Sequence, residues 1–319
     1  MTISASAVRI GVSTCLLGEK VRFDGGHKRD PFLNDAFAHF VDWVPVCPEV
    51  EAGFGTPREA MRLVRVDDDV RLVTVRTKVD VTAQLARAVD HRIPSLVKLD
   101  LDGYVLKKDS PSCGLFRVKV YAESGHNERN GRGLFATALV EALPLLPVEE
   151  EGRLGDPRLR ENFIERVFAY RRLREFFGAE PRAGDLVRFH TRHKLLLLAH
   201  APAKYAELGR MVASVRGRLS RKVMDAYAES FMAALSVLAS RGRHANVLQH
   251  MAGYFQTLVD AESRRELGQT IEDYQKGLVP LVVPITLIAH HARRHDVRYL
   301  LDQVYLQPHP KELMLRNHV

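Results

Sequence analysis

Three cysteines, Cys15, Cys47 and Cys113, are the residues of this sequence best suited to chemistry. Each follows a short run of residues that predicts a β-strand and lies in a loop containing proline or glycine. The carboxyl ends of parallel strands meet at one edge of a sheet, where open α/β folds bind their ligands. Parallel pairing of the three strands is therefore expected to bring the three sulfur atoms together. The strand-like runs are 8–14, 41–46 and 103–108.

The spacing of the cysteines bears on which metal they can bind. No two of them form the closely spaced pair that is common in zinc sites. They match a [4Fe–4S] cluster that is held by three thiolates and keeps one iron open. Such an iron is a Lewis acid and prefers sulfur as a partner. Two alternatives stay open, namely a site made of one cysteine plus Glu49, and cysteines that only fill the core.

Polar residues close to the cysteines in sequence are the candidate catalytic groups. Glu49 is a candidate general acid or base, an additional metal ligand, or a carboxylate that caps the next helix. Ser110 and Ser112 flank Pro111, and they either bind substrate or cluster sulfide or complete the turn. Lys107 either steers an anionic substrate or ends an exposed strand.

Strand-like and helical runs alternate up to about residue 147, which predicts a mostly parallel, helix-flanked sheet. We expect a helix from Pro31 through Phe40, a strand over 70–75 and a helix over 79–91. The turn Thr56-Pro57-Arg58 is expected to open a further helix.

The polar segment 149–157 contains glycine and proline and predicts a domain boundary, which divides the chain into 1–148 and 149–319. Beyond it the pattern is helical almost throughout. Asp156 and Pro157 are expected to begin a helix that ends at Gly178, Asp185 to cap the next helix, and Pro202 to begin another. The predicted fold is an α/β N-terminal domain followed by an all-α C-terminal domain.

The composition is that of a globular protein, with 46% hydrophobic and 27% charged residues in 319. The longest apolar run, 278–289, contains two prolines and is too short to span a bilayer. Met1–Ala5 shows neither the basic nor the apolar region of a secretory signal. Three cysteines without a disulfide framework indicate a reducing cytoplasm. No membrane association and no obligatory protein partner are inferred.

Charge is divided unevenly between the two halves of the chain. Residues 1–150 hold 20 basic and 21 acidic residues, a net charge of −1, whereas 151–319 hold 27 and 18, a net charge of +9. This asymmetry is typical of a nucleic-acid-binding module, although a basic half also keeps a protein soluble.

Several basic side chains of the C-terminal half are candidate RNA contacts. Arg188 and Arg192 are four residues apart on one helix and are expected to clamp a phosphate. His190 and His193 have no neighbouring carboxylate, so they are expected on a helix face or against RNA rather than on a metal. The expected tRNA-binding residues are Arg188, Arg192, Lys194, Arg218, Arg221 and Lys222.

The N-terminal motifs resemble those of the thiouracil desulfidase family, also called DUF523, and the C-terminal motifs resemble DUF1722. Together they cover nearly the whole chain. The N-terminal motifs are 12–18, 24–26, 46–50, 56–58 and 110–114; the C-terminal ones are 192–197, 246–250, 279–281 and 303–310.

The combination resembles bacterial desulfidases that remove sulfur from 4-thiouridine in tRNA. The resemblance implies that the three cysteines hold a [4Fe–4S] cluster with an open iron, and that Glu49 and Ser110 form the catalytic pair. Ser112, Lys107 and Arg58 are then expected to bind substrate, and the DUF1722-like half to bind tRNA.

Two positions depart from the family pattern. Phe23 stands where tyrosine is frequent, and 51–55 differs from the Gly-Gly-Leu-Pro form of stand-alone desulfidases. The second difference favours thiolated tRNA over free thiouracil. The predicted function is non-redox conversion of 4-thiouridine in tRNA to uridine, with release of sulfide. The alternatives are a desulfidase of free thiopyrimidines and a non-enzymatic iron–sulfur sensor that binds RNA.

Overall fold

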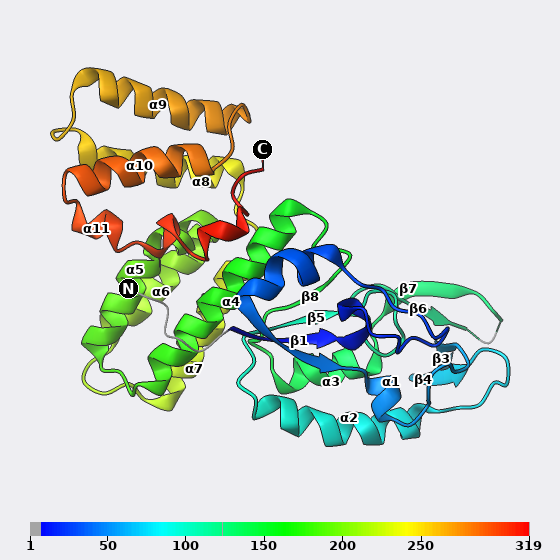
Figure 1. Ribbon diagram of the computed structural model, residues 1–319. Helices are drawn as coiled ribbons and strands as arrows, with labels where there is room; N and C mark the ends of the chain where they lie inside the picture. The colour runs from blue at the N-terminus through cyan, green and yellow to red at the C-terminus, as the bar shows by residue number, and fades with distance from the viewer. Residues whose placement is uncertain (1–7, 123, 319) are drawn as a thin grey trace. The chain divides into compact units, whose positions relative to one another are not determined.

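The computed structural model describes residues 8–122 and 124–318 (Figure 1). The chain divides into two units between Asp156 and Pro157. Met1–Ala5, where no signal sequence is expected, lies outside the described residues.

The first unit is built on a four-stranded sheet in the order β2-β1-β5-β8. All of its pairings are parallel, with Ile10 of β1 opposite Trp43 of β2 and Gly103 of β5. This confirms the predicted parallel sheet. The strands are β1 (Val8–Ser13), β2 (Val41–Val46), β5 (Gly103–Leu106) and β8 (Val148–Glu150).

The centre of this sheet is covered on both faces. Ile10, Val12 and Val105 are fully buried, as central strands of a parallel sheet require. Gly11 carries no side chain because the Tyr104 ring occupies that space, and a Cβ there would lie 2.2 Å from Tyr104 Cδ2.

Helices α2 (Thr82–Val97) and α3 (Leu134–Ala142) run side by side on one face of the sheet (Figure 1). Leu85, Val89 and Leu96 form the buried stripe of α2. The expected helix over 31–40 is a π-helical turn, Phe32–Ala36, followed by a 3-10 turn, Phe37–Phe40.

A second sheet, in the order β4-β3-β6-β7, consists of two antiparallel hairpins joined by parallel pairing of β3 with β6. The prediction of a helix after Thr56-Pro57-Arg58 is wrong, because the chain there forms strand β3, which begins at Met61. Asp67 adopts a positive φ of 53° and turns the chain directly into β4. The strands are β3 (Met61–Val66), β4 (Asp69–Thr74), β6 (Val118–Tyr121) and β7 (Asn127–Gly131).

The position of β8 also corrects the expected domain boundary at 148/149. Tyr104 and Leu106 of β5 pair with Val148 and Glu150 of β8, so the first two residues of the segment 149–157 belong to the first sheet. The division lies near the end of that segment, between Asp156 and Pro157.

The second unit is all helical, as predicted. Its first helix begins at Pro157 and ends at Gly178, and α6 begins at Pro202. Asp185 lies inside α5 rather than before it, where its carboxylate accepts a hydrogen bond from the Arg182 N–H. The helices are α4 (Pro157–Gly178), α5 (Ala183–His200), α6 (Pro202–Ser214), α7 (Arg221–Ser236), α8 (Arg241–Ala252), α9 (Ala261–Lys276), α10 (Val282–Arg294) and α11 (Arg298–Leu301).

None of the helices within 8–122 and 124–318 combines the length and the apolar character that crossing a bilayer requires.

Buried histidines are a feature of the second unit. Burial lowers the pKa of five of them, to about 4 for His309, where the Arg316 charge adds to the effect. His190 and His193, expected on a helix face or against RNA, are among them and lie on the buried face of α5. The five are His190, His193, His244, His291 and His309.

A histidine with a lowered folded-state pKa destabilises the fold as the pH falls below its unfolded value of about 6.5, because only the unfolded chain takes up the proton. For His309 the expected loss is about 1.4 kcal/mol per pH unit between 6.5 and its folded-state pKa of about 4. His309→Asn keeps a donor for the Pro310 carbonyl but does not titrate. Chemical denaturation at several pH values should give a shallower acid slope for the variant. Parallel slopes for the two proteins would contradict the prediction.

Candidate functional site

The three cysteines lie at the carboxyl edge of the first sheet. Cys15 lies in the 3-10 turn Thr14–Leu17 after β1, and Cys47 directly follows β2 and precedes α1 (Pro48–Glu51). Cys113 lies in the loop after β5. Because β2 and β5 both pair in parallel with β1, the three loops leave the sheet at the same edge, as the sequence predicts.

Burial and the charges of neighbouring groups shift the pKa values of the three thiols. Burial is the largest cause of the raised pKa of all three. The pKa of Cys15 is raised to about 11, and the Cys47 thiol is the second cause of this rise after burial. The pKa of Cys113 is raised by burial, by the Glu49 carboxylate and by both other thiols, and a hydrogen bond with Ser13 opposes the rise.

Three free thiols make up this donor set. Among the described residues, no group of three or more His, Cys, Asp or Glu side chains that could hold a metal ion is present. A cubane cluster is larger than an ion and takes all of its protein ligands as thiolates. Nearby cations oppose the rise in thiol pKa and would balance thiolate charge. They are Lys107 and Arg22 for Cys15, and Arg58 for Cys47.

Glu49 is held by two side chains from distant parts of the sequence. The Ser112 hydroxyl donates to its Oε1 at 2.8 Å. Arg58 donates to its Oε2 from Nε at 2.8 Å and also from Nη2. The Glu49 side chain is 13% exposed and that of Arg58 is 6% exposed, so this ion pair is nearly closed to solvent. Arg58, expected to bind substrate, thus binds the carboxylate.

Arg58 also joins two loops to this carboxylate. Its Nη1 donates to the carbonyl oxygens of Val21 at 2.9 Å and Gly55 at 2.8 Å. Val21 belongs to the loop after Cys15, and Gly55 follows α1. One guanidinium group therefore fixes the positions of Glu49 and of the loop that follows a cysteine.

Ser110 and Ser112 have different roles in the loop that carries Cys113. The Ser110 hydroxyl oxygen accepts the backbone N–H groups of Ser112 at 3.2 Å and of Cys113 at 3.0 Å. These bonds leave its own proton as the group it can offer to a ligand. Ser112 is fully buried and directs its proton to Glu49.

Two glutamates that follow the start of β8 hold the same loop. Glu150 Oε1 accepts the N–H groups of Leu115 at 2.8 Å and Phe116 at 3.1 Å. Glu151 accepts the Lys107 ammonium at 2.5 Å and the Lys108 N–H at 2.7 Å. Lys107, expected to steer substrate, is therefore paired with Glu151.

Ser13 is a site residue that the sequence analysis missed. It is 3% exposed, bonds the Cys113 thiol and accepts the Lys107 N–H at 3.0 Å. Its place at the end of β1, two residues before Cys15, is the one signal for it in the sequence.

The expected RNA contacts do not form one cluster of free charges. Arg188 donates to Asp185, Arg218 to Glu180 at 2.6 Å and Arg221 to Asp225 at 2.9 Å, all on exposed surface. Arg188 and Arg192 both lie on α5, and the phosphate clamp expected of them stays a prediction. The Lys194 ammonium lies 5.0 Å from the centre of the Tyr299 ring, and Lys222 is exposed.

Arg58→Lys should lower the free energy of unfolding by about 2–4 kcal/mol, because lysine cannot bridge Glu49, Val21 and Gly55 together. Arg71→Lys is a matched control in the same unit, since Arg71 forms an exposed ion pair with Asp69. Arg71→Lys should lower the free energy of unfolding by less than about 1 kcal/mol. Chemical denaturation measures both; equal losses would show that Arg58 is not a structural centre of the site.

Two family descriptions match this chain. The family described as 2-thiouracil desulfurase matches residues 10–151, and the DUF1722 family of unknown function matches residues 194–310. A solved structure of the [4Fe–4S]-dependent thiouracil desulfidase TudS shares 31% identity over 46% of this chain and 93% of its own, with a TM-score of 0.38.

Two relatives each match half of the chain or less. The uncharacterized protein YbbK of Bacillus subtilis (strain 168) is 29% identical over 140 residues, which are 41% of this chain and 89% of YbbK. The uncharacterized protein YbgA of Escherichia coli (strain K12) is 30% identical over 161 residues, which are 50% of this chain and 95% of YbgA. The chain therefore belongs to the family of proteins that join a 2-thiouracil desulfurase domain to a DUF1722 domain.

Proposed function

We propose that this protein is an iron–sulfur-dependent, non-redox desulfidase that converts 4-thiouridine in tRNA into uridine and releases sulfide. The observation that carries the proposal is the meeting of three cysteines beside Glu49 at the edge of a parallel sheet. The match of residues 10–151 to 2-thiouracil desulfurase supports the reaction class.

Cys15, Cys47 and Cys113 would hold a [4Fe–4S] cluster with one iron free of protein ligands. When bound, the cluster supplies a Lewis acid that draws electron density from a thiocarbonyl group.

Glu49 is the general base in this proposal. Arg58 and Ser112 orient its carboxylate, and Oε1, which accepts only the Ser112 hydroxyl, retains a lone pair that can accept a proton from water. The water oxygen adds to C4 of the base, the carbon–sulfur bond breaks, and the two water protons leave with the sulfur as hydrogen sulfide. Carbon, sulfur and oxygen keep their oxidation states, so the reaction needs no electron donor.

Ser110 is the complementary donor. Because its oxygen already accepts two backbone N–H groups, its proton is directed to the substrate, where it holds the base or protonates the leaving sulfur. Ser112 acts on Glu49 instead and orients it.

The second unit is proposed to bind tRNA. Its share of the sequence carries the whole positive excess, and exposed ion pairs such as Arg221 with Asp225 are worth at most about 1 kcal/mol. Phosphates can therefore replace the acidic partners at small cost. Phosphate contacts would also offset the few kcal/mol needed to unstack a thiolated base.

A second candidate function is desulfidation of free thiopyrimidines, which the family description of 2-thiouracil desulfurase favours. Comparing turnover of 2-thiouracil with turnover of bulk tRNA separates the two. Loss of 4-thiouridine from tRNA without turnover of thiouracil supports the tRNA proposal, and the opposite result overturns it.

Glu49→Gln and Ser110→Ala should each lower turnover by roughly 100-fold or more, the contribution expected of a general acid or base. Neither change should reduce the iron and sulfide content after anaerobic reconstitution, because neither residue supplies a thiolate. Cys47→Ser should reduce both iron content and turnover. Ser112→Ala should have a smaller effect than Ser110→Ala, since Arg58 still holds Glu49. Full activity of Glu49→Gln would end the proposed mechanism, and sulfur loss catalysed by the wild-type protein would exclude the sensor alternative.

Binding of tRNA should weaken steeply with salt, and the double variant Arg221→Gln, Lys222→Gln should lower the slope of log K against log[salt] by about 0.7–0.9 for each phosphate that these two side chains neutralise. The control Arg265→Gln, Lys276→Gln removes the same charge from α9. A flat salt response would point to a partner other than nucleic acid. Equal slopes for the two variants would show that Arg221 and Lys222 lie outside the interface.

A further inference from the structure

A cavity of about 440 Å³ in the second unit lies outside all the sites considered so far. Pockets for small ligands commonly measure about 300–1,000 Å³. Its walls come from α4, the end of α5, and the start of α8 with the preceding segment 238–240. Tyr274 of α9, Leu281 before α10, and His318 complete them.

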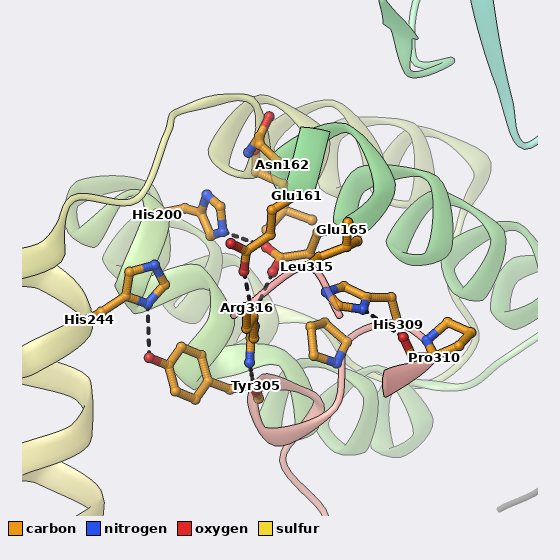
Figure 2. Close-up of polar contacts among 12 residues, drawn as sticks. Glu161, Asn162, Glu165, His200, His244, Tyr305, His309, Pro310, Leu315 and Arg316 are labelled. Carbon is orange, nitrogen blue, oxygen red and sulfur yellow. Dashed lines mark hydrogen bonds and ion pairs between the residues drawn. The ribbon is translucent and has the colours of Figure 1, made fainter. Parts of the chain in front are cut away.

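Beside this cavity lies a buried ionic network (Figure 2). His200 Nε2 lies 2.5 Å from Glu165 Oε1, and Arg316 donates to Glu165 Oε2 at 3.2 Å. The His200 Nδ1 lies 2.6 Å from the Val237 carbonyl oxygen, so both ring nitrogens face acceptors. Each nitrogen therefore carries a hydrogen, and the ring is positively charged. The Glu165 carboxylate raises the pKa of His200, and His200 in turn helps to lower the pKa of Glu165 to about 2. These groups satisfy one another.

Two groups on the cavity wall keep capacity for a ligand. His244 uses Nδ1 for the Tyr305 hydroxyl, 2.9 Å away, and Figure 2 shows its Nε2 on the opposite side of the ring. Burial lowers the pKa of His244 to about 3, so the ring is neutral. Glu161 accepts from Arg316 with Oε1 at 3.0 Å, whereas its Oε2 has a long contact of 3.7 Å to His318 Nε2.

The remaining wall offers positive charge and an apolar surface. Arg158 and Arg241 are exposed residues of the wall, and Arg241 opens α8, a twelve-residue helix that begins after Ser240. A helix start and guanidinium groups favour an anion. Leu238, Leu281 and the Tyr274 ring supply apolar wall.

We propose that this cavity binds a nucleoside monophosphate unit, either free or within an RNA strand. The base lies against Tyr274 with an amino edge toward Glu161 and His244, and the phosphate lies at the start of α8 beside Arg241. Carboxylates accept from the amino group of cytosine, whereas uracil presents a carbonyl oxygen at that position. The site should therefore prefer cytosine over uracil. The inference extends the proposed RNA-binding role of this unit, but it does not depend on desulfidation.

Titration calorimetry on the full chain with CMP, UMP and cytidine tests the proposal. CMP should bind more tightly than UMP and than cytidine. Arg241→Gln should weaken CMP binding about tenfold, the value of a charge-assisted hydrogen bond, and leave cytidine unaffected. The control Arg265→Gln removes an exposed arginine outside the cavity and should change neither.

A pair of substitutions at His244 tests the base contact. His244→Asn retains an amide near Nδ1 for Tyr305 and loses the group at Nε2, whereas His244→Gln reaches the Nε2 position. The asparagine variant should lose the preference for CMP, and the glutamine variant should retain it. Equal melting temperatures of the two variants exclude an effect of unfolding.

Short oligonucleotides identify the source of the nucleotide. Tighter binding of a cytidine hexamer than of CMP, with the same sensitivity to Arg241→Gln, assigns the cavity to RNA, and equal binding per nucleotide assigns it to free nucleotides. The inference is overturned if neither CMP nor the hexamer binds, or if Arg241→Gln binds CMP as tightly as wild type does. The ionic network of Glu165, His200 and Arg316 would then serve only to anchor the C-terminal segment. Loss of 4-thiouridine from bulk tRNA, measured with the wild-type protein, tests the desulfidase proposal without reference to CMP binding or to Arg241→Gln, so the failure of this proposal and of the desulfidase proposal are distinguishable.

Discussion

Parallel pairing of β1 with both β2 and β5 is the constraint on which the first unit depends. A parallel strand must be reached by a crossover, so the cysteines are separated in sequence by whole helices and loops. Their loops nevertheless leave the sheet at one edge. Three soft donors thus come together without the closely spaced cysteine pair by which metal sites are commonly found in sequences.

Bringing thiols together in a buried place is unfavourable for their ionised forms, since burial and mutual repulsion both raise their pKa values. The surrounding cations act in the opposite direction. Arg58 is the most connected of them, since it joins Glu49 to the loops at Val21 and Gly55. The same contacts that orient the carboxylate therefore also support the electrostatics of the thiols.

The sequence predicted the parallel sheet and the meeting of the cysteines because apolar runs and proline or glycine mark where strands end. It also predicted the helix starts at Pro157 and Pro202, because proline is favoured at the first position of a helix. It missed β8, because Val148-Glu149-Glu150 has no apolar alternation and its glutamates are buried through contacts made in the folded chain.

Partnerships over long sequence distances have no local signal either. The bond from Ser112 to Glu49 joins residues 63 positions apart, so the sequence could not assign separate roles to the two serines. Histidines at i and i+3 look alike on a surface and in a core, so the sequence left His190 and His193 either on a helix face or against RNA, and the structure buries both.

The attachment of the Cys113 loop to Glu150 and Glu151 has a consequence for biosynthesis. These glutamates are among the last residues of the first unit to leave the ribosome, and until they do, the backbone of Leu115 and Phe116 and the ammonium of Lys107 lack their partners. The contacts that hold the Cys113 loop can therefore form only after residue 151 has emerged, although Cys15, Cys47 and Cys113 all precede it in the chain.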